Sequence, residues 1–280
     1  MMGSSYFRQL RFAIFTWMKK NAPIGIFDSG VGGSSIWQEI NHLLPNENTI
    51  YLADSKNAPY GYKTPEEITA LSIKNTEVLI QLGCKLIVVA CNTATTNSIS
   101  DLRSKFNIPI IGIEPAVKPA ALKSASKSIG ILATKGTLSS ILFSRTSTKY
   151  TKNISMVEVV GEGLVSLIEE GKIDSKEMTK LLLKYTKPMI ERGIDYLVLG
   201  CSHYPYLIPQ LKEILPAHIK ILHSGKAVAQ HTKRTLASMN LLQNEKNRPS
   251  LQFYTNTETS TLQYLLREYS EDITVHTKGF

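Results

Sequence analysis

Short apolar runs of strand length alternate along the chain with longer segments in which apolar residues recur every three or four positions. The runs are rich in β-branched residues, as in KLIVVA at 85–90 and DYLVLG at 195–200. This alternation is typical of buried parallel strands joined by helices, so we predict an α/β fold with mainly parallel sheets. Strands are expected near 23–27, 51–54, 85–90, 108–113, 129–133, 156–160, 195–200, 251–255 and 272–276.

Helices are predicted between these strands, near 34–44, 65–83, 92–106, 137–149, 163–170 and 175–192. The clearest start is Thr64-Pro65-Glu66-Glu67, where a capping threonine precedes a proline at the first helical position and a glutamate three residues after the cap. That combination satisfies the free amide groups of a first helical turn.

One unit of this pattern occurs twice. Ile24-Gly25-Ile26-Phe27 is matched by Ile129-Gly130-Ile131-Leu132, which begins 105 residues later. Cys91 is matched by Cys201, which lies 110 residues later, and each cysteine follows a predicted buried strand. We therefore expect two similar lobes that face each other across a cleft, with one thiol on each side.

The chain should cross between these lobes near Glu114-Pro115 and return after the apolar run at 219–222. We predict a first lobe formed by residues 21–113 and 224–280 and a second lobe formed by residues 114–223. Residues 1–20 match neither lobe, and we interpret them as an amino-terminal extension or a misassigned start, because Met18-Lys19-Lys20 resembles an ordinary start.

Polar residues gather where the predicted strands end, and these positions have structural as well as chemical interpretations. Asp28 and Ser29 precede a glycine-rich segment and could simply form a turn, and the residues after each cysteine could cap a helix. Beside a cleft, a thiol at a helix N-terminus should have a lowered pKa and could accept a proton. His203, two residues after Cys201, could serve as its proton partner. Cys84 is interpreted as a small buried hydrophobic residue.

Composition narrows the class of protein. The chain has 280 residues, 42% of them hydrophobic, which suits a globular protein with a sizeable core. The chain has a net charge of +9, but its basic residues form no run, so we expect no nucleic-acid partner. A small anionic substrate is as good an explanation of the positive charge. Three cysteines without CxxC spacing indicate a reducing, cytoplasmic setting and no zinc site. The apolar patch at 12–18 is too short to span a membrane.

Six ordered motifs within about residues 23–225 resemble glutamate racemase, a cofactor-independent enzyme family that supplies D-glutamate for peptidoglycan. The motifs are GIFDSGVGG, NAPYG, VVACNTAT, IGIEPAVKPA, ILATKGT and LVLGCSHYP. The resemblance implies that Cys91 and Cys201 are the two acid/base thiols and that no cofactor or metal takes part. It is compatible with a homodimer, although the sequence does not define the oligomeric state.

The resemblance also implies roles for the surrounding polar residues. Asp28, Glu169 and His203 would support the thiols. The residues implied to contact the substrate or line its site are Asp28, Ser29, Tyr60, Gly61, Asn92, Thr93, Thr134, Thr137, Ser202 and His203.

The chain departs from the family pattern at three positions. Ser202 stands where the family usually has threonine, which keeps the hydroxyl group. His223-Ser224 replaces a usual Asp-Ser pair, so the family's carboxylate is missing there, and Asp54-Ser55 replaces a usual Asp-Thr pair. None of these changes removes a thiol or a group implied to bind the substrate's carboxylate.

Two other functions remain open from the residues alone. A racemase for aspartate or another amino acid would also use paired thiols, although the Cys201-Ser202-His203 triplet favours glutamate. A binding or redox module could instead join Cys91 and Cys201 in a disulfide or use them to hold an anion.

Overall fold

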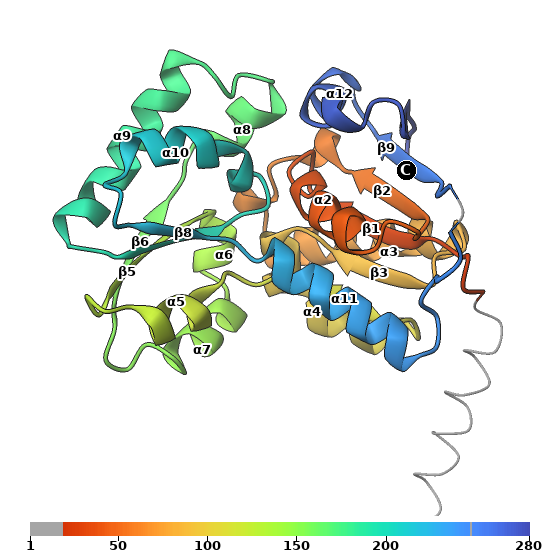
Figure 1. Ribbon diagram of the computed structural model, residues 1–280, viewed down its shortest axis with the longest axis horizontal. Helices are drawn as coiled ribbons and strands as arrows, with labels where there is room; N and C mark the ends of the chain where they lie inside the picture. Colours follow the sequence, from red (N-terminus) through yellow and green to blue (C-terminus); the bar gives the residue numbers. More distant parts are fainter. Residues whose placement is uncertain (1–18, 247) are drawn as a thin grey trace, which may run out of the picture.

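The computed structural model describes residues 19–246 and 248–280, so most of the predicted amino-terminal extension lies outside the described residues. Two sheets, each covered by helices, form two lobes that lie side by side (Figure 1). The predicted α/β class with mainly parallel strands is therefore confirmed, and every pair of neighbouring strands in both sheets is parallel.

The larger sheet has six strands in the order β10-β9-β2-β1-β3-β4. Its strands are β1 (Ile24–Asp28), β2 (Thr49–Ala53), β3 (Leu86–Val89), β4 (Ile110–Gly112), β9 (Leu251–Thr255) and β10 (Ile273–Thr277). The first four come from the first part of the chain, and β9 and β10 add two strands beside β2. β9, from the last part of the chain, thus lies beside β2, from its first part (Figure 1).

The smaller sheet has four strands in the order β6-β5-β7-β8. They are β5 (Ser128–Ala133), β6 (Ser155–Val160), β7 (Tyr196–Gly200) and β8 (Lys220–Leu222). This order repeats the order β2-β1-β3-β4 of the larger sheet, strand for strand. The predicted internal repeat is therefore present in the topology, and the strands that precede the two matched cysteines, β3 and β7, occupy equivalent places.

Five of the six helices predicted with bounds lie close to their predicted places, the sixth is divided in two, and α5, α10, α11 and α12 were given no bounds from the sequence. They are α2 (Ser34–Leu43), α3 (Pro65–Gln81), α4 (Asn92–Lys105), α5 (Val117–Lys123), α6 (Lys135–Leu138), α7 (Ile141–Thr148), α8 (Leu164–Glu169), α9 (Lys176–Glu191), α10 (Ile208–Ile214), α11 (Gly225–Ser238) and α12 (Ser260–Leu265). Short 3-10 turns are η1 (Ser55–Asn57), η2 (Tyr60–Tyr62), η3 (Tyr204–Leu207) and η4 (Arg267–Tyr269).

The capping signals at 64–67 work as predicted. Thr64 Oγ1 accepts a hydrogen bond from the Glu67 amide at 3.2 Å, and Glu67 Oε2 accepts one from the Thr64 amide at 2.8 Å. The prediction of one continuous helix over 137–149 is wrong, because α6 ends before Ser140 and α7 begins after it. The Ser140 hydroxyl accepts a hydrogen bond from the Phe143 amide at 3.2 Å and so starts a new helix.

Aromatic packing joins the end of the chain to the first lobe. The Trp37 ring of α2 lies edge-on to Phe253 of β9 and to Tyr269, with ring centroids 4.8 and 5.0 Å apart. Its indole nitrogen donates a hydrogen bond to Thr49 Oγ1 at 2.9 Å. Such pairs add to the free energy gained from burying the rings, so β9 and β10 are integral to the larger sheet.

A buried ion pair lies at the edge of the larger sheet where its strands begin. Lys85 Nζ lies 2.6 Å from Glu47 Oε2, and neither side chain is more than 1% exposed. The ammonium group also donates to the carbonyl oxygens of Lys20 and Leu241, and Glu47 Oε1 accepts from the Gln243 amide at 2.8 Å. These bonds satisfy both charges in a region without water access.

The chain passes between the two sheets twice, after β4 and after β8. The two connections contact each other, because the Ser224 hydroxyl donates a hydrogen bond to the Glu114 carbonyl oxygen. The carboxyl ends of β1 and β3 meet those of β7 and β5 at the junction of the lobes, because Asp28 hydrogen-bonds to Ser202 and Thr93 to Thr134.

Candidate active site

Both matched cysteines line one enclosed cavity at the junction of the lobes. Cys91 follows β3 and Cys201 follows β7, so the thiols come from equivalent strand ends of the two sheets. The cavity has a volume of about 10 Å³, which is room for roughly one water molecule. Its lining residues are Ser29, Pro59, Tyr60, Gly61, Cys91, Asn92, Thr93, Thr134, Val165, Cys201, Ser202 and His203.

Ten of the residues that the sequence predicts for the site therefore line this cavity. Three others, Asp28, Thr137 and Glu169, do not line it but hydrogen-bond to residues that do. Two lining residues, Pro59 and Val165, were not singled out from the sequence. Pro59 lies inside the NAPYG motif, whereas Val165 belongs to the apolar face of α8 and carries no sequence signal that separates it from the core.

Cys91 is the N-cap of α4 and lies 3.5 Å from the Ser29 hydroxyl oxygen, to which its thiol donates. The Ala94 amide points at its sulfur from 3.4 Å, as expected at a helix N-terminus. The prediction of a lowered pKa is nevertheless wrong for this thiol. Burial raises the pKa of Cys91, and the negative charge of Asp28 adds to the effect, so desolvation outweighs the helix N-terminus.

Cys201 has a different neighbourhood. Its sulfur lies 3.7 Å from Nδ1 of His203, so the thiol and the imidazole form a hydrogen-bonded pair. The α-helix expected directly after this cysteine does not form, because the chain makes a turn and then the 3-10 segment η3. Pro205 and Pro209 have no amide hydrogen to donate, so they interrupt a regular helix here.

His203 is held between Cys201 and Glu169. Its Nε2 lies 2.6 Å from Glu169 Oε1, and the ring is 1% exposed. Burial disfavours the charged ring, but hydrogen bonds to Cys201 and Glu169 raise the pKa of His203 well above its ordinary value. The Gly32 amide also approaches Nε2 at 3.3 Å, but the shorter contact and the raised pKa favour a protonated Nε2 that donates to Glu169.

Glu169 connects the two lobes. Besides His203, its Oε1 accepts a hydrogen bond from the Val31 amide at 2.7 Å, and its Oε2 accepts one from the Ser55 hydroxyl at 2.8 Å. Glu169 lies on α8 after β6, whereas Val31 and Ser55 follow β1 and β2 of the larger sheet. Its carboxylate is therefore bound on both sides of the junction.

The glycine-rich turn after β1 leaves room for Glu169 and His203 of the other lobe. A Cβ atom on Gly30 would lie 1.8 Å from Glu169 Oε1, and one on Gly32 would lie 2.2 Å from His203 Nδ1. Because neither glycine has a Cβ atom, the backbone here can approach two side chains of the other lobe.

Asp28 lies behind the cavity wall and is fully buried. Its Oδ2 accepts hydrogen bonds from the amides of Gly30 and Gly33 at 3.1 and 3.0 Å, and its Oδ1 accepts one from the Ser202 hydroxyl at 2.9 Å. Burial raises its pKa, while the charge of His203 and the Gly33 amide oppose the increase. The carboxylate thus lies where it can fix Ser202 and influence Cys91.

Hydroxyl and amide groups complete the wall. Thr93 Oγ1 of the larger lobe lies 2.8 Å from Thr134 Oγ1 and 3.3 Å from Thr137 Oγ1 of the smaller lobe. Asn92 is 2% exposed, and its side-chain nitrogen has no hydrogen-bond partner among the described residues. Buried donors are almost always paired, so this amide is suited to an acceptor atom inside the cavity.

Tyr60 contributes to the wall with its ring and backbone. Its hydroxyl donates to Asp54 Oδ2 and accepts from Asn75 Nδ2 at 3.2 Å, so it is engaged by two partners that do not line the cavity. Gly61 lies close to Thr134 of the other lobe, because a Cβ on Gly61 would lie 3.1 Å from Thr134 Cβ.

A family profile described as Asp/Glu/Hydantoin racemase matches residues 24–232. A glutamate racemase from Herpetosiphon aurantiacus is 40% identical over 237 residues, which are 85% of this chain and 93% of the relative. This chain belongs to the Asp/Glu/Hydantoin racemase family. The predicted resemblance to glutamate racemases is confirmed, and so is the prediction that the chain is an isomerase.

Solved structures of family members agree with this assignment. A glutamate racemase isoform from Bacillus anthracis superposes with a TM-score of 0.83 at 28% identity, covering 93% of this chain and 98% of that one. The Escherichia coli glutamate racemase in complex with L-glutamate and an activator, UDP-MurNAc-Ala, superposes with a TM-score of 0.80 at 31% identity, covering 91% and 98%.

Within this racemase, the unusual His223 lies outside the thiol cavity. The ring is 23% exposed, and its Nε2 lies 3.8 Å from Glu39 Oε1 on α2. Burial lowers its pKa, and Glu39 only partly opposes this effect. His223 therefore does not replace a carboxylate near the thiols. The acidic residues that hydrogen-bond to side chains of the cavity wall are Asp28, Asp54 and Glu169.

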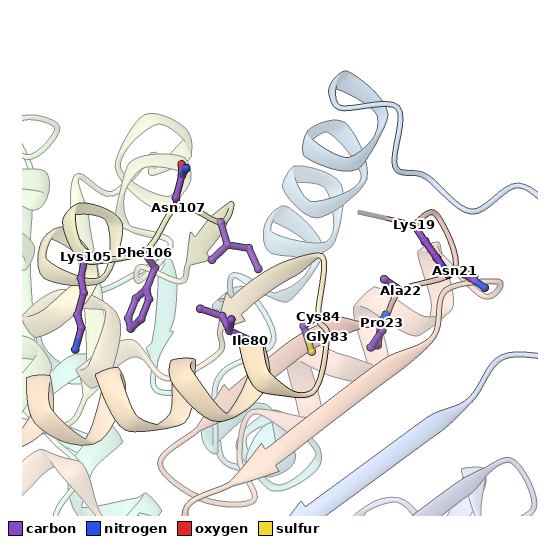
Figure 2. Close-up of a pocket in the computed structure, with 11 residues that line it drawn as sticks. Lys19, Asn21, Ala22, Pro23, Ile80, Gly83, Cys84, Lys105, Phe106 and Asn107 are labelled. Carbon is purple, nitrogen blue, oxygen red and sulfur yellow. The ribbon is translucent and has the colours of Figure 1, made fainter. Parts of the chain in front are cut away.

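A larger cavity, of about 670 Å³, lies at the opposite edge of the larger sheet (Figure 2). Its only thiol belongs to Cys84, which lies beside Gly83 and Ile80, and burial raises the pKa of this thiol to about 12. None of the residues around the thiol cavity lines it. This environment fits the interpretation of Cys84 as a small buried hydrophobic residue.

All three cysteines are free thiols. Among the described residues there is no group of three or more His, Cys, Asp or Glu side chains arranged for a metal ion. Within the same part of the chain, no helix has the length and apolar character needed to cross a membrane.

Proposed function

We propose that this racemase interconverts L- and D-glutamate with Cys91 and Cys201 as the two acid/base groups. The observation that carries the proposal is their placement at equivalent strand ends of two repeated sheets, with both thiols in the wall of one cavity. Inversion at a carbon requires removal of a proton on one face and delivery on the other. Two thiols contributed by opposite lobes suit that geometry.

For L-glutamate, the Cys201 thiolate would take the α-proton, so that the C–H bond breaks and an S–H bond forms. The electron pair left on Cα is delocalised into the α-carboxylate. The Cys91 thiol then delivers its proton to the opposite face, and its S–H bond becomes the new C–H bond. D-glutamate would react by the same steps in reverse, with Cys91 as the base.

Proton supply differs between the two sides. His203 lies 3.7 Å from Cys201, and its raised pKa keeps it protonated near neutral pH, so it would exchange a proton with that thiol. Glu169 would hold the ring in place through its 2.6 Å contact. Cys91 has the Ser29 hydroxyl instead, and the buried Asp28 charge disfavours its thiolate.

The substrate itself would relieve that effect. We propose that the α-ammonium group binds near Asp28 and neutralises the negative charge that raises the pKa of Cys91. Formation of the Cys91 thiolate would then be easiest when substrate is bound. In the enzyme without substrate, the Cys91 thiol would therefore keep its proton.

The α-carboxylate would be held by the groups that follow the two cysteines. Asn92 carries a buried side-chain nitrogen without a partner among the described residues, and Thr93 and Ser202 line the same cavity. The Ser202 hydroxyl would have to turn from Asp28 to donate to the substrate. Donors already oriented in a buried site stabilise the charge that develops on the carboxylate during proton removal. Thr134 and Thr137 would fix Thr93 from the other lobe.

Selection of glutamate would come from the loop that carries Tyr60 and Gly61. The Tyr60 hydroxyl is engaged by Asp54 and Asn75, so backbone amides of this loop would take the side-chain carboxylate. The cavity of about 10 Å³ is too small for glutamate, so the lobes must move apart to admit it. The lobes that would separate are residues 21–113 with 224–280 and residues 114–223.

We further propose that the product supplies D-glutamate for peptidoglycan synthesis in the cytoplasm, a reducing compartment in which both thiols would stay reduced. Support for this role comes from the glutamate racemases to which the chain is similar. Restoring growth of a bacterial strain that requires D-glutamate would test it.

The direct test is a chiral assay of the purified full chain with L-glutamate and no added cofactor. We expect conversion to a racemic mixture, at a much higher kcat/KM than with L-aspartate. Cys84→Ala is a matched control, because it removes a buried thiol outside the cavity and should leave racemisation unchanged. Conversion of aspartate in preference to glutamate would overturn the proposed substrate, and absence of any racemisation would overturn the proposed activity.

A further inference from the structure

We infer that Asn256, in the turn between β9 and α12, is a positioning residue for the loop that carries Tyr60 and Gly61. Asn256 lies beyond residues 24–232, the part of the chain matched by the family profile. The inference rests on the proposed function, in which this loop selects the substrate. It assigns to the end of the chain a part in substrate binding.

The Asn256 side chain holds the start of the loop with both of its polar atoms. Its Nδ2 donates to Asp54 Oδ1 at 2.6 Å, and its Oδ1 accepts from the Lys56 amide at 2.8 Å. Asp54 directly follows β2, and residues 55–57 form η1. The amide therefore bridges a side chain and a backbone group on either side of Ser55.

Asp54 passes this restraint on to Tyr60. The Asp54 carboxylate is 1% exposed, accepts from Asn57 Nδ2 at 2.8 Å through Oδ1, and accepts the Tyr60 hydroxyl through Oδ2. Since Asn256 binds Oδ1, it fixes the orientation of the carboxylate that binds Tyr60. A short chain of hydrogen bonds thus leads from the end of the larger sheet to the cavity wall.

The helix that follows this turn, α12, contacts the helix that carries Glu169. The Thr261 hydroxyl of α12 donates to the Glu169 carbonyl oxygen at 2.9 Å, and the Glu169 carboxylate accepts from Ser55 at 2.8 Å. Asn256 therefore binds the neighbours of Ser55, and Thr261 binds the backbone of Glu169. The turn after β9 and the start of α12 thus contact both the substrate loop and α8.

Removal of the Asn256 side chain should weaken binding more than chemistry. The Lys56 amide and one lone pair of Asp54 would lose their partner, while the thiols, His203 and Glu169 would keep theirs. We expect the loss of these two hydrogen bonds to raise KM roughly tenfold, which corresponds to about 1.4 kcal/mol, with kcat altered by less than about threefold.

The experiment compares Asn256→Ala, Asn256→Asp and the wild type with both enantiomers of glutamate. Asn256→Asp keeps an acceptor for the Lys56 amide but places a second carboxylate against Asp54, so its KM should rise more than that of Asn256→Ala. Gln263→Ala, an exposed position on α12, is the matched control and should keep the wild-type KM. Asn256→Ser replaces the alanine variant if that variant does not fold.

Amide hydrogen exchange provides a second readout that needs no substrate. Residues 55–62 should exchange faster in Asn256→Ala, while the strands of the smaller sheet should keep their wild-type exchange. If the wild type racemises glutamate and both Asn256 variants keep the wild-type KM, the inference about Asn256 is overturned while the proposed function stands. Unchanged exchange in residues 55–62 would overturn it even if the proposed substrate proved wrong.

Discussion

The Ser202 hydroxyl donates a hydrogen bond to Asp28 Oδ1 across the junction of the two lobes, at 2.9 Å. Asp28 ends β1 of the larger sheet, and Ser202 follows Cys201 after β7 of the smaller sheet. The carboxylate that influences Cys91 is therefore bound directly to the residue beside Cys201. This contact links the environments of the two thiols whenever the lobes are together, and it motivates the predictions that follow.

Single replacement of either thiol should abolish racemisation, because a base on one face cannot deliver a proton to the other. In deuterated water, Cys201→Ala should still exchange the α-proton of D-glutamate through Cys91, but not that of L-glutamate. Cys91→Ala should show the reverse preference. Proton NMR of each variant with each pure enantiomer measures the exchange. Racemisation near the wild-type rate in both variants would show that the thiols are not the bases.

His203→Gln should lower kcat by about 10²-fold and should affect the two directions unequally, because His203 assists only Cys201. KM should change less, as for an interaction made mainly in the transition state. Steady-state kinetics with each enantiomer provide the measurement. Because the equilibrium constant between the two enantiomers is fixed, any difference between their kcat values must be matched by a difference between their KM values. Small and equal effects in both directions would indicate a structural role.

The same variant tests the raised pKa of His203. A folded-state pKa above the unfolded value means that the charged ring contributes stability, fully present below about pH 6.5 and lost as the pH rises through the folded pKa. The free energy of unfolding of the wild type should therefore exceed that of His203→Gln most clearly at mildly acidic pH. Urea titrations at a series of pH values should show this difference shrinking on the alkaline side. A difference independent of pH would contradict the assignment.

Asp28→Asn should stabilise the fold while lowering activity. The folded-state pKa of Asp28 is raised, so its ionised form costs stability above its unfolded pKa, and asparagine removes that buried charge. Loss of the charge near the α-ammonium should lower kcat/KM at least about tenfold. Thermal unfolding at neutral pH should give a higher Tm, and the gain should narrow as the pH falls. A lower Tm with unchanged activity would contradict both arguments.

Lys85→Met should destabilise the protein by about 3–5 kcal/mol, because it leaves the Glu47 carboxylate buried without its partner. The double variant Lys85→Met/Glu47→Gln should recover much of the loss, since it buries no charge. Urea unfolding of the two variants and of Glu47→Gln completes a double-mutant cycle. A cost below about 1 kcal/mol for Lys85→Met would show that water reaches the pair.

Much of this architecture follows from local features of the sequence. The capping box at 64–67, the helix start after Cys91 and the strands around both cysteines depend on neighbours within a few residues, so their pattern predicts them. The repeat predicts that two thiols occupy equivalent strand ends, and the two sheets have the same strand order. The break between α6 and α7 was missed because a serine in a helical pattern does not reveal which backbone group it will bind.

Other properties depend on contacts between residues far apart in the chain. The fold class, the pair of cysteines and the polar residues beside them can be inferred from the sequence alone. The folded chain was needed to show that Cys91 is too buried for its helix N-terminus to lower its pKa, and that Asn256 reaches the Asp54 loop from 202 positions away. Burial and long-range hydrogen bonding depend on how the sheets and the end of the chain pack, and no local pattern records that packing.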